Sequence, residues 1–93
     1  MANLRVLKKQ IDYCLEEVVF DCDMAICFQP SKEVEIMNLM QEAVEMRNAF
    51  FKKAMNPAEP HNKSLVRKHY AALRRDMAES FAGLFADLSA VCE

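Results

Sequence analysis

The sequence predicts an all-α protein, an up-down-up antiparallel bundle of three long helices. The chain has one glycine and three prolines among 93 residues, so few positions favour a turn. It is rich in residues that form helices well and poor in β-branched residues. Apolar residues also recur at the three- and four-residue spacing of a helix face. We expect one domain over residues 1–93, with helices near 3–28, 31–55 and 62–91.

The first helix is expected to end before Pro30, because a proline disfavours helical backbone at the residue preceding it. An apolar stripe at helical spacing marks the face that packs in a core. In this helix the inner stripe consists of Leu4, Leu7, Ile11, Leu15, Val18, Cys22 and Ala25.

Ser31 is a good N-cap for the second helix, with Glu33 in its first turn. The segment MNPAEPHNKS carries two prolines and several capping residues, which predicts a loop before the third helix. Expected core residues of the second helix are Ile36, Met37, Met40, Ala43, Val44, Phe50, Phe51 and Ala54. Those of the third are Val66, Tyr70, Leu73, Met77, Phe81, Leu84, Leu88 and Val91.

A second apolar row, which we call the outer stripe, runs along the opposite side of the first helix. It consists of Val6, Tyr13, Phe20 and Cys27, which recur every seven residues, together with Met24. A helix of a three-helix bundle needs only one apolar face, and an exposed aromatic row marks an interface. We therefore expect self-association as a homodimer through this stripe. The alternatives are that the other helices cover it or that it lines a ligand groove.

Charge is divided between the two ends of the expected bundle. Residues 1–12 and 46–76 carry eleven basic and three acidic side chains, whereas residues 13–45 and 77–93 carry one basic and eleven acidic ones. The first and third helices begin basic and end acidic, against their macrodipoles, so helix electrostatics do not explain this pattern.

Two functions are compatible with this polarity. In an antiparallel homodimer, with a two-fold axis near Glu16 and Glu17, Tyr13 meets the partner's Phe20. Arg5, Lys8 and Lys9 then face the partner's Asp21 and Asp23, although the glutamates near the axis repel unless they splay outward. In the other function, the basic end binds a polyanion such as a nucleic acid. The chain is acidic overall and has no DNA-reading motif, which disfavours the second.

Arg47 is the one charged residue within the apolar arc of the second helix, so its guanidinium needs a partner or a path to solvent. Asp12 and Asp76 lie at about its level in the neighbouring helices. We expect a buried ion pair with one of them that fixes helix register. The alternative is an anion site formed by Arg47 with Arg74 or Lys8.

The opening LRVLKKQID, with Leu4, Arg5, Ile11 and Asp12, resembles the start of the first helix of helical chorismate mutases. The resemblance covers about nine residues and implies an all-helical, intertwined dimeric enzyme. That family also has an arginine late in the first helix that binds a substrate carboxylate. Here that place falls around Cys22 and Asp23, and no basic residue lies between Lys9 and Lys32. We therefore interpret the likeness as a pattern of amphipathic helices.

We predict no catalytic site, cofactor or metal. The four cysteines fit no disulfide or zinc framework, and the Glu-x-x-His, glycine-loop and nucleophile-elbow motifs do not occur. Cys22 is expected to be a small core residue, and Asp21 and Asp23 to be solvated. The N-terminus does not resemble a secretory signal and no apolar run is long enough to cross a membrane, so a cytoplasmic location is expected.

Overall fold

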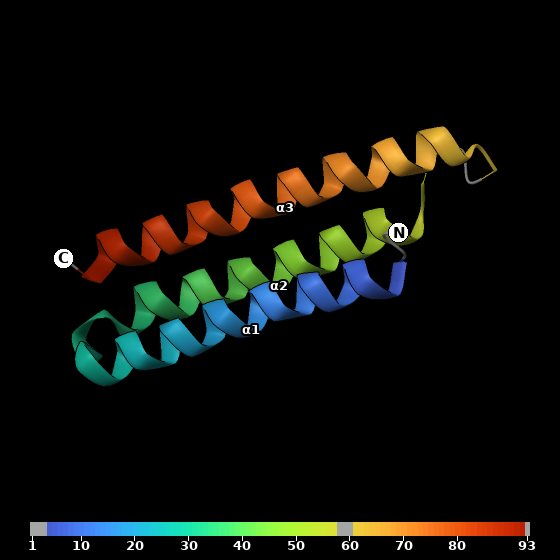
Figure 1. Ribbon diagram of the computed structural model, residues 1–93. Coiled ribbons are helices and arrows are strands. Elements are labelled where there is room, and N and C mark those ends of the chain that lie inside the picture. Colours follow the sequence, from blue (N-terminus) through green and yellow to red (C-terminus); the bar gives the residue numbers. More distant parts are fainter. Residues whose placement is uncertain (1–3, 58–60, 93) are drawn as a thin grey trace.

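The computed structural model describes residues 4–57 and 61–92, which form three α-helices and one short 3₁₀ turn (Figure 1). No strand occurs in these two ranges. The all-α prediction is therefore confirmed. The molecule is a rod with extents of 51 × 19 × 19 Å.

Helix α1 spans Leu4–Phe28, and the expected start at residue 3 lies outside the described residues. The backbone leaves the helix at Gln29, where φ is −136° and ψ is 72°, as expected of a residue before proline. The 3₁₀ turn η1 follows over Pro30–Lys32. Its Lys32 N–H donates a hydrogen bond to the Gln29 carbonyl at 3.0 Å.

Helix α2 spans Glu33–Met55, so the prediction that Ser31 caps it is wrong. Ser31 lies inside η1, because the 3₁₀ turn begins at Pro30 and delays the α-helix by two residues. Lys32 occupies the N-cap position without a side-chain cap, and Glu33 does fall in the first turn. The helix begins acidic and ends with Lys52 and Lys53, as its macrodipole favours.

Helix α3 spans Lys63–Cys92. The side chain of Asn62 accepts a hydrogen bond from the Leu65 N–H at 3.2 Å, and its carbonyl accepts one from the Val66 N–H at 3.0 Å. Asn62 is thus the residue that caps this helix. Neither α1 nor α3 has an acidic residue in its first turn or a basic one in its last, as the sequence indicated.

Figure 1 shows α1 and α2 side by side, joined by the short turn at one end, with α3 ending near that turn. The Gln29 side-chain amide donates to the Cys92 carbonyl at 2.6 Å and links the turn to the end of α3. One core runs between the helices. Its buried residues are Leu7, Ile11, Val18 and Cys22 of α1, Ile36, Ala43, Phe50 and Ala54 of α2, and Leu73, Met77, Phe81, Leu84 and Leu88 of α3.

Two residues predicted to be core are exposed. Met37 and Val44 retain 50% and 37% of their accessible surface. Met37 comes directly after the buried Ile36, and Val44 directly after the buried Ala43. One residue rotates the side chain by about 100°, which takes both out of contact with the neighbouring helices. None of the described helices combines the length and the apolar character that spanning a membrane requires.

Candidate association surface

The outer stripe of α1 is exposed along its whole length, and no described helix covers it. The exposed fraction is 42% for Val6, 61% for Tyr13, 65% for Phe20 and 43% for Met24, and Cys27 is exposed as well. The opposite side of the same helix carries Leu7, Ile11, Val18 and Cys22, each 2% exposed or less. Helix α1 therefore has one buried apolar face and one exposed apolar face.

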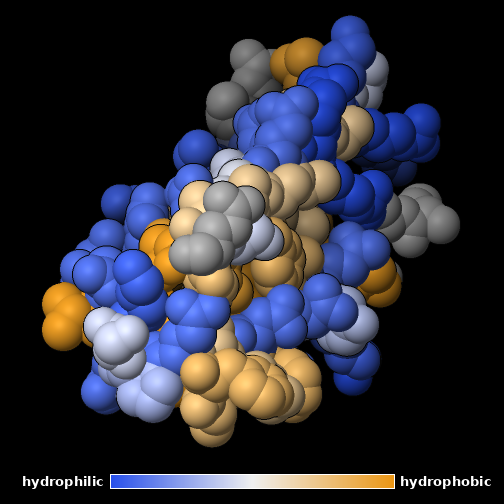
Figure 2. Space-filling model, turned by 90° about the vertical axis from the view of Figure 1, so that its left-hand side faces the viewer, coloured by the Kyte–Doolittle hydropathy of each residue, from blue (hydrophilic) through white to orange (hydrophobic). Residues whose placement is uncertain are grey.

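The stripe extends further than the sequence analysis predicted, because Phe28 is 76% exposed at the end of α1. Its position four residues after Met24 and eight after Phe20 was the signal that could have placed it there. Figure 2 views the molecule from the end at which α1 turns into α2. Hydrophobic atoms gather at the lower edge of that view, on the side of α1 that faces away from α3, with hydrophilic atoms around them.

A groove of about 530 Å³ adjoins the stripe on its α3 side. It lies between the first half of α1 and the middle of α3 and is mainly apolar. The groove is lined by Val6, Lys9, Gln10, Tyr13, Cys14, Arg74 and Met77.

Arg74 contributes an unpaired charge to this groove. Its side chain is half-buried, its Nε is buried without a hydrogen-bond partner, and no ion pair to it occurs within residues 4–57 and 61–92. An enclosed polar nitrogen without an acceptor costs free energy.

Charged and polar groups flank the stripe on α1. A hydrogen bond with Glu17 raises the pKa of the Tyr13 hydroxyl, so this hydroxyl and carboxylate are already partners within one chain. Arg5 and Lys9 are exposed, but the ammonium of Lys8 lies 5.8 Å from the centre of the Phe51 ring on α2. In the single chain Lys8 therefore lies toward α2, and its approach to a partner's aspartates stays a prediction.

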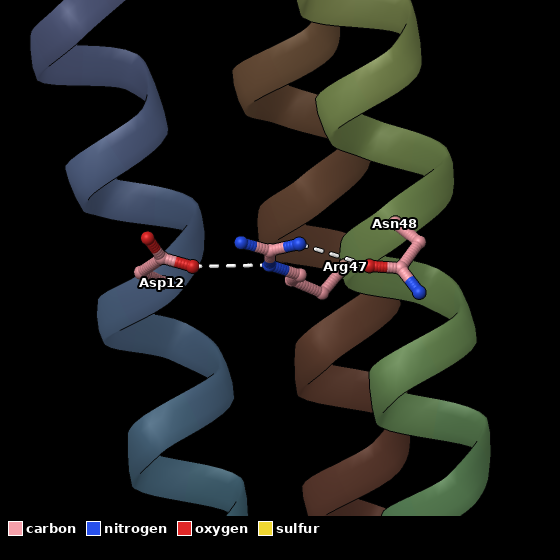
Figure 3. Close-up of polar contacts among 3 residues, drawn as sticks. All are labelled: Asp12, Arg47 and Asn48. Carbon is pink, nitrogen blue, oxygen red and sulfur yellow. Dashed lines mark hydrogen bonds and ion pairs between the residues drawn. The ribbon is translucent and has the colours of Figure 1, made fainter.

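Arg47 pairs with Asp12 of α1, its Nε donating to Oδ1 at 3.0 Å (Figure 3). Its Nη1 donates to Asn48 Oδ1 at 2.9 Å, and the guanidinium carbon lies 3.7 Å from the centre of the Phe51 ring. The expected burial of this pair is wrong, since the side chains are 30% and 47% exposed. The guanidinium reaches the boundary between α1 and α2, so its head is partly in solvent.

The other two residues of that predicted cluster, Asp76 and Arg74, lie on α3, and neither contacts Arg47 through a hydrogen bond or ion pair in the described ranges. Arg47–Asp12 is the one ion pair formed among residues 4–57 and 61–92. Most charges at both ends of the molecule are thus solvated instead of paired with each other.

The four cysteines are free, and Cys22 is buried as expected of a core residue. Burial raises the pKa of the Cys22 thiol, and the nearby carboxylates of Asp21 and Asp23 raise it further. Cys92, at the end of α3, packs against the same core as Cys22. Across the described parts of the chain, no three of the His, Cys, Asp and Glu side chains are grouped as a metal ion would require.

No known family, curated protein or solved structure matches this chain.

Proposed function

We propose that this protein acts through association with a second copy of itself, as an up-down-up antiparallel three-helix bundle that forms a homodimer through the outer stripe of α1. The role is binding rather than catalysis. The observation that carries the proposal is the exposure of Tyr13 and Phe20, at 61% and 65%, on a helix whose opposite face already packs in the core through Leu7, Ile11, Val18 and Cys22. A contiguous exposed apolar row of this kind favours a partner surface that removes it from water.

The charge pattern favours an antiparallel arrangement. A two-fold axis between Glu16 and Glu17 brings Tyr13 opposite the partner's Phe20 and Val6 opposite the partner's Cys27. It also places the basic first half of α1 against the acidic second half of the other copy. A parallel pair would instead place like charges together, which opposes association.

The two glutamates near the axis are the main opposing feature. Glu16 and Glu17 are both exposed. Glu17 already interacts with the Tyr13 hydroxyl of its own chain, which raises the pKa of that hydroxyl and supports an outward position for this carboxylate. In this arrangement Tyr13 and Phe20 form two equivalent aromatic contacts, one on each side of the axis.

The first test replaces Phe20 by Glu and measures the dissociation constant by sedimentation equilibrium. Loss of the aromatic contact and introduction of a charge at the centre of an apolar interface cost at least about 2 kcal/mol, so the constant should rise at least about 30-fold. The matched control is Leu65→Glu, because Leu65 is also exposed, at 42%, but lies at the start of α3. The control should remain dimeric.

Circular dichroism should show the same helicity in both variants and the natural protein. Unfolding of Phe20→Glu would mean that this residue belongs to the core, and an unchanged dimer would mean that the interface lies elsewhere. Either result contradicts the proposal.

A second candidate is the binding of a polyanion by the basic end, favoured by the scarcity of ion pairs among the described residues there, where only Arg47 has an acidic partner. Contacts to phosphates weaken steeply with salt. Titration of labelled single-stranded DNA at low salt tests this function, which predicts binding that disappears as salt is raised.

A further inference from the structure

The proposed homodimer leaves open what fills the groove between α1 and α3 and what pairs with Arg74. The groove shares Val6 and Tyr13 with the outer stripe, and its other wall, with Arg74, belongs to α3. The groove is mainly apolar, is lined in part by Val6 and Tyr13, and carries in its wall the guanidinium of Arg74, which forms no ion pair within residues 4–57 and 61–92. It is therefore suited to an apolar group with a carboxylate next to it.

The sides of α1 can be assigned from its contacts. Cys14 lines the groove with residues of α3, so it marks the α3 side of the stripe. Asp21 follows Cys14 by seven residues, which on an α-helix returns to within about 20° of the same direction. Asp21 therefore lies on the α3 side as well, and it is exposed.

Asp23 lies on the other side of the stripe. It follows Asp12 by eleven residues, about three helical turns, and so shares its direction. Asp12 contacts Arg47 of α2, which marks the α2 side. Asp21 and Asp23 thus flank Phe20 and Met24 on opposite sides of the stripe.

The two-fold axis then determines which groups meet. The two α1 helices are antiparallel, and the two-fold axis is perpendicular to the plane that contains them. The α3 sides of both copies then lie on the same side of the dimer. Early residues of one α1 helix lie opposite late residues of the other. The groove lies at the level of Val6 to Cys14, so it faces the partner's chain from about Val19 to Cys27. On the α3 side, the acid within that stretch is Asp21.

We propose that the α1–α3 groove receives the partner copy's Phe20 and Met24, and that the partner's Asp21 forms an ion pair with Arg74. This inference rests on the proposed homodimer and specifies its register and side. The dimer contains the pair twice, and each pair supplies a carboxylate to a half-buried guanidinium whose Nε has no hydrogen-bond partner among the described residues. Charge-assisted contacts of this kind at the edge of an aromatic cluster fix orientation as well as strengthen binding.

The test is a charge exchange with three variants, Asp21→Arg, Arg74→Glu and the two changes together, each measured for its dimer dissociation constant. Each single change places like charges opposite one another at two symmetric positions, so each constant should rise at least about tenfold. The double variant restores opposite charges, and its constant should return to within about threefold of the natural protein. Arg75→Glu, at the exposed position next to Arg74, is the matched control and should leave the dissociation constant unchanged.

Arg74→Gln, which removes the charge with little change in shape, accompanies Arg74→Glu in case the latter unfolds. Asp21→Arg is at an exposed position and should leave the fold intact. If the double variant is as weak as the two single effects combined, or if neither single change matters while Phe20→Glu still disrupts the dimer, this inference is wrong and the proposed homodimer stands. A natural protein that is monomeric at every concentration overturns both.

Discussion

Arg47 illustrates how a charged residue can occupy an apolar helix face without being buried. Its side chain packs across the Phe51 ring, and its head emerges between α1 and α2, where Asp12 and Asn48 accept hydrogen bonds. Both members of the ion pair are substantially exposed, so solvent screens their attraction. Contacts of a cation with an aromatic ring and ion pairs at this exposure each contribute up to about 1 kcal/mol.

Arg47→Met should therefore lower the free energy of unfolding by at most about 1 kcal/mol, because methionine keeps an apolar stem over Phe51 and Asp12 remains hydrated. Urea unfolding followed by circular dichroism measures this change. Complete loss of the fold would mean that the pair determines helix register. The conservative control is Arg47→Lys, which retains the charge.

Stability should fall at alkaline pH. Burial raises the pKa of the Cys22 and Cys14 thiols, and the hydrogen bond with Glu17 raises that of Tyr13. In the unfolded chain the thiols lose their protons near pH 8.5, before they do so in the folded chain, so the folded state is disfavoured as pH rises above that value. Stability should be constant between about pH 7 and 8 and decline from about pH 9.

Urea unfolding under reducing conditions at several pH values measures this decline. Cys22→Ala removes the most enclosed of these thiols and should reduce the slope. A decline that is unchanged in Cys22→Ala would assign it to other groups.

At the scale of elements, the sequence predicted all three helices to within two residues at the described ends, because prolines and heptad-spaced apolar residues mark them directly. It misplaced the start of α2, since the sequence signals for an N-cap at Ser31 do not reveal a 3₁₀ turn beginning at Pro30. The inner face of α1 was predicted well. The predicted inner face of α2 was too wide, because it included the exposed Met37 and Val44. A helical wheel shows which residues are apolar, but it does not show how much of the helix surface the neighbouring helices cover.

The candidate association surface was also predictable in part from the spacing of apolar residues. Heptad spacing identified the outer stripe from Val6 to Cys27, and the four-residue step from Met24 to Phe28 could have extended it. The groove beside it could not be predicted, since its lining combines residues of α1 with Arg74 and Met77 of α3. Its existence depends on how closely those two helices approach, which a single helix pattern does not determine.

The cap of α3 provides a test at the level of one helix end. Asn62→Ala removes the acceptor for the Leu65 N–H and should cost about 1 kcal/mol of unfolding free energy. Asn38→Ala is the matched control, because Asn38 is exposed inside α2, where alanine has the higher helix propensity. Urea unfolding should show a loss for the first variant and no loss for the second. Equal effects would show that the cap does not stabilise the helix.

At the scale of the whole molecule, two features point to the same partner. The outer stripe exposes aromatic surface on α1, and the charges at the two ends of the molecule are mostly unpaired within the described ranges. The proposed antiparallel copy would account for both, because one two-fold rotation would cover the stripe and bring opposite charges together. A polyanion would use the basic end alone and would leave Tyr13 and Phe20 in water.

The most direct measurement is the solution mass by light scattering, at low and high salt. The account predicts twice the mass of the chain under both conditions, because an apolar interface persists when salt screens its charged edges. A dimer that dissociates at high salt would identify the charged ends as the main source of affinity. A monomer under both conditions would contradict the central claim.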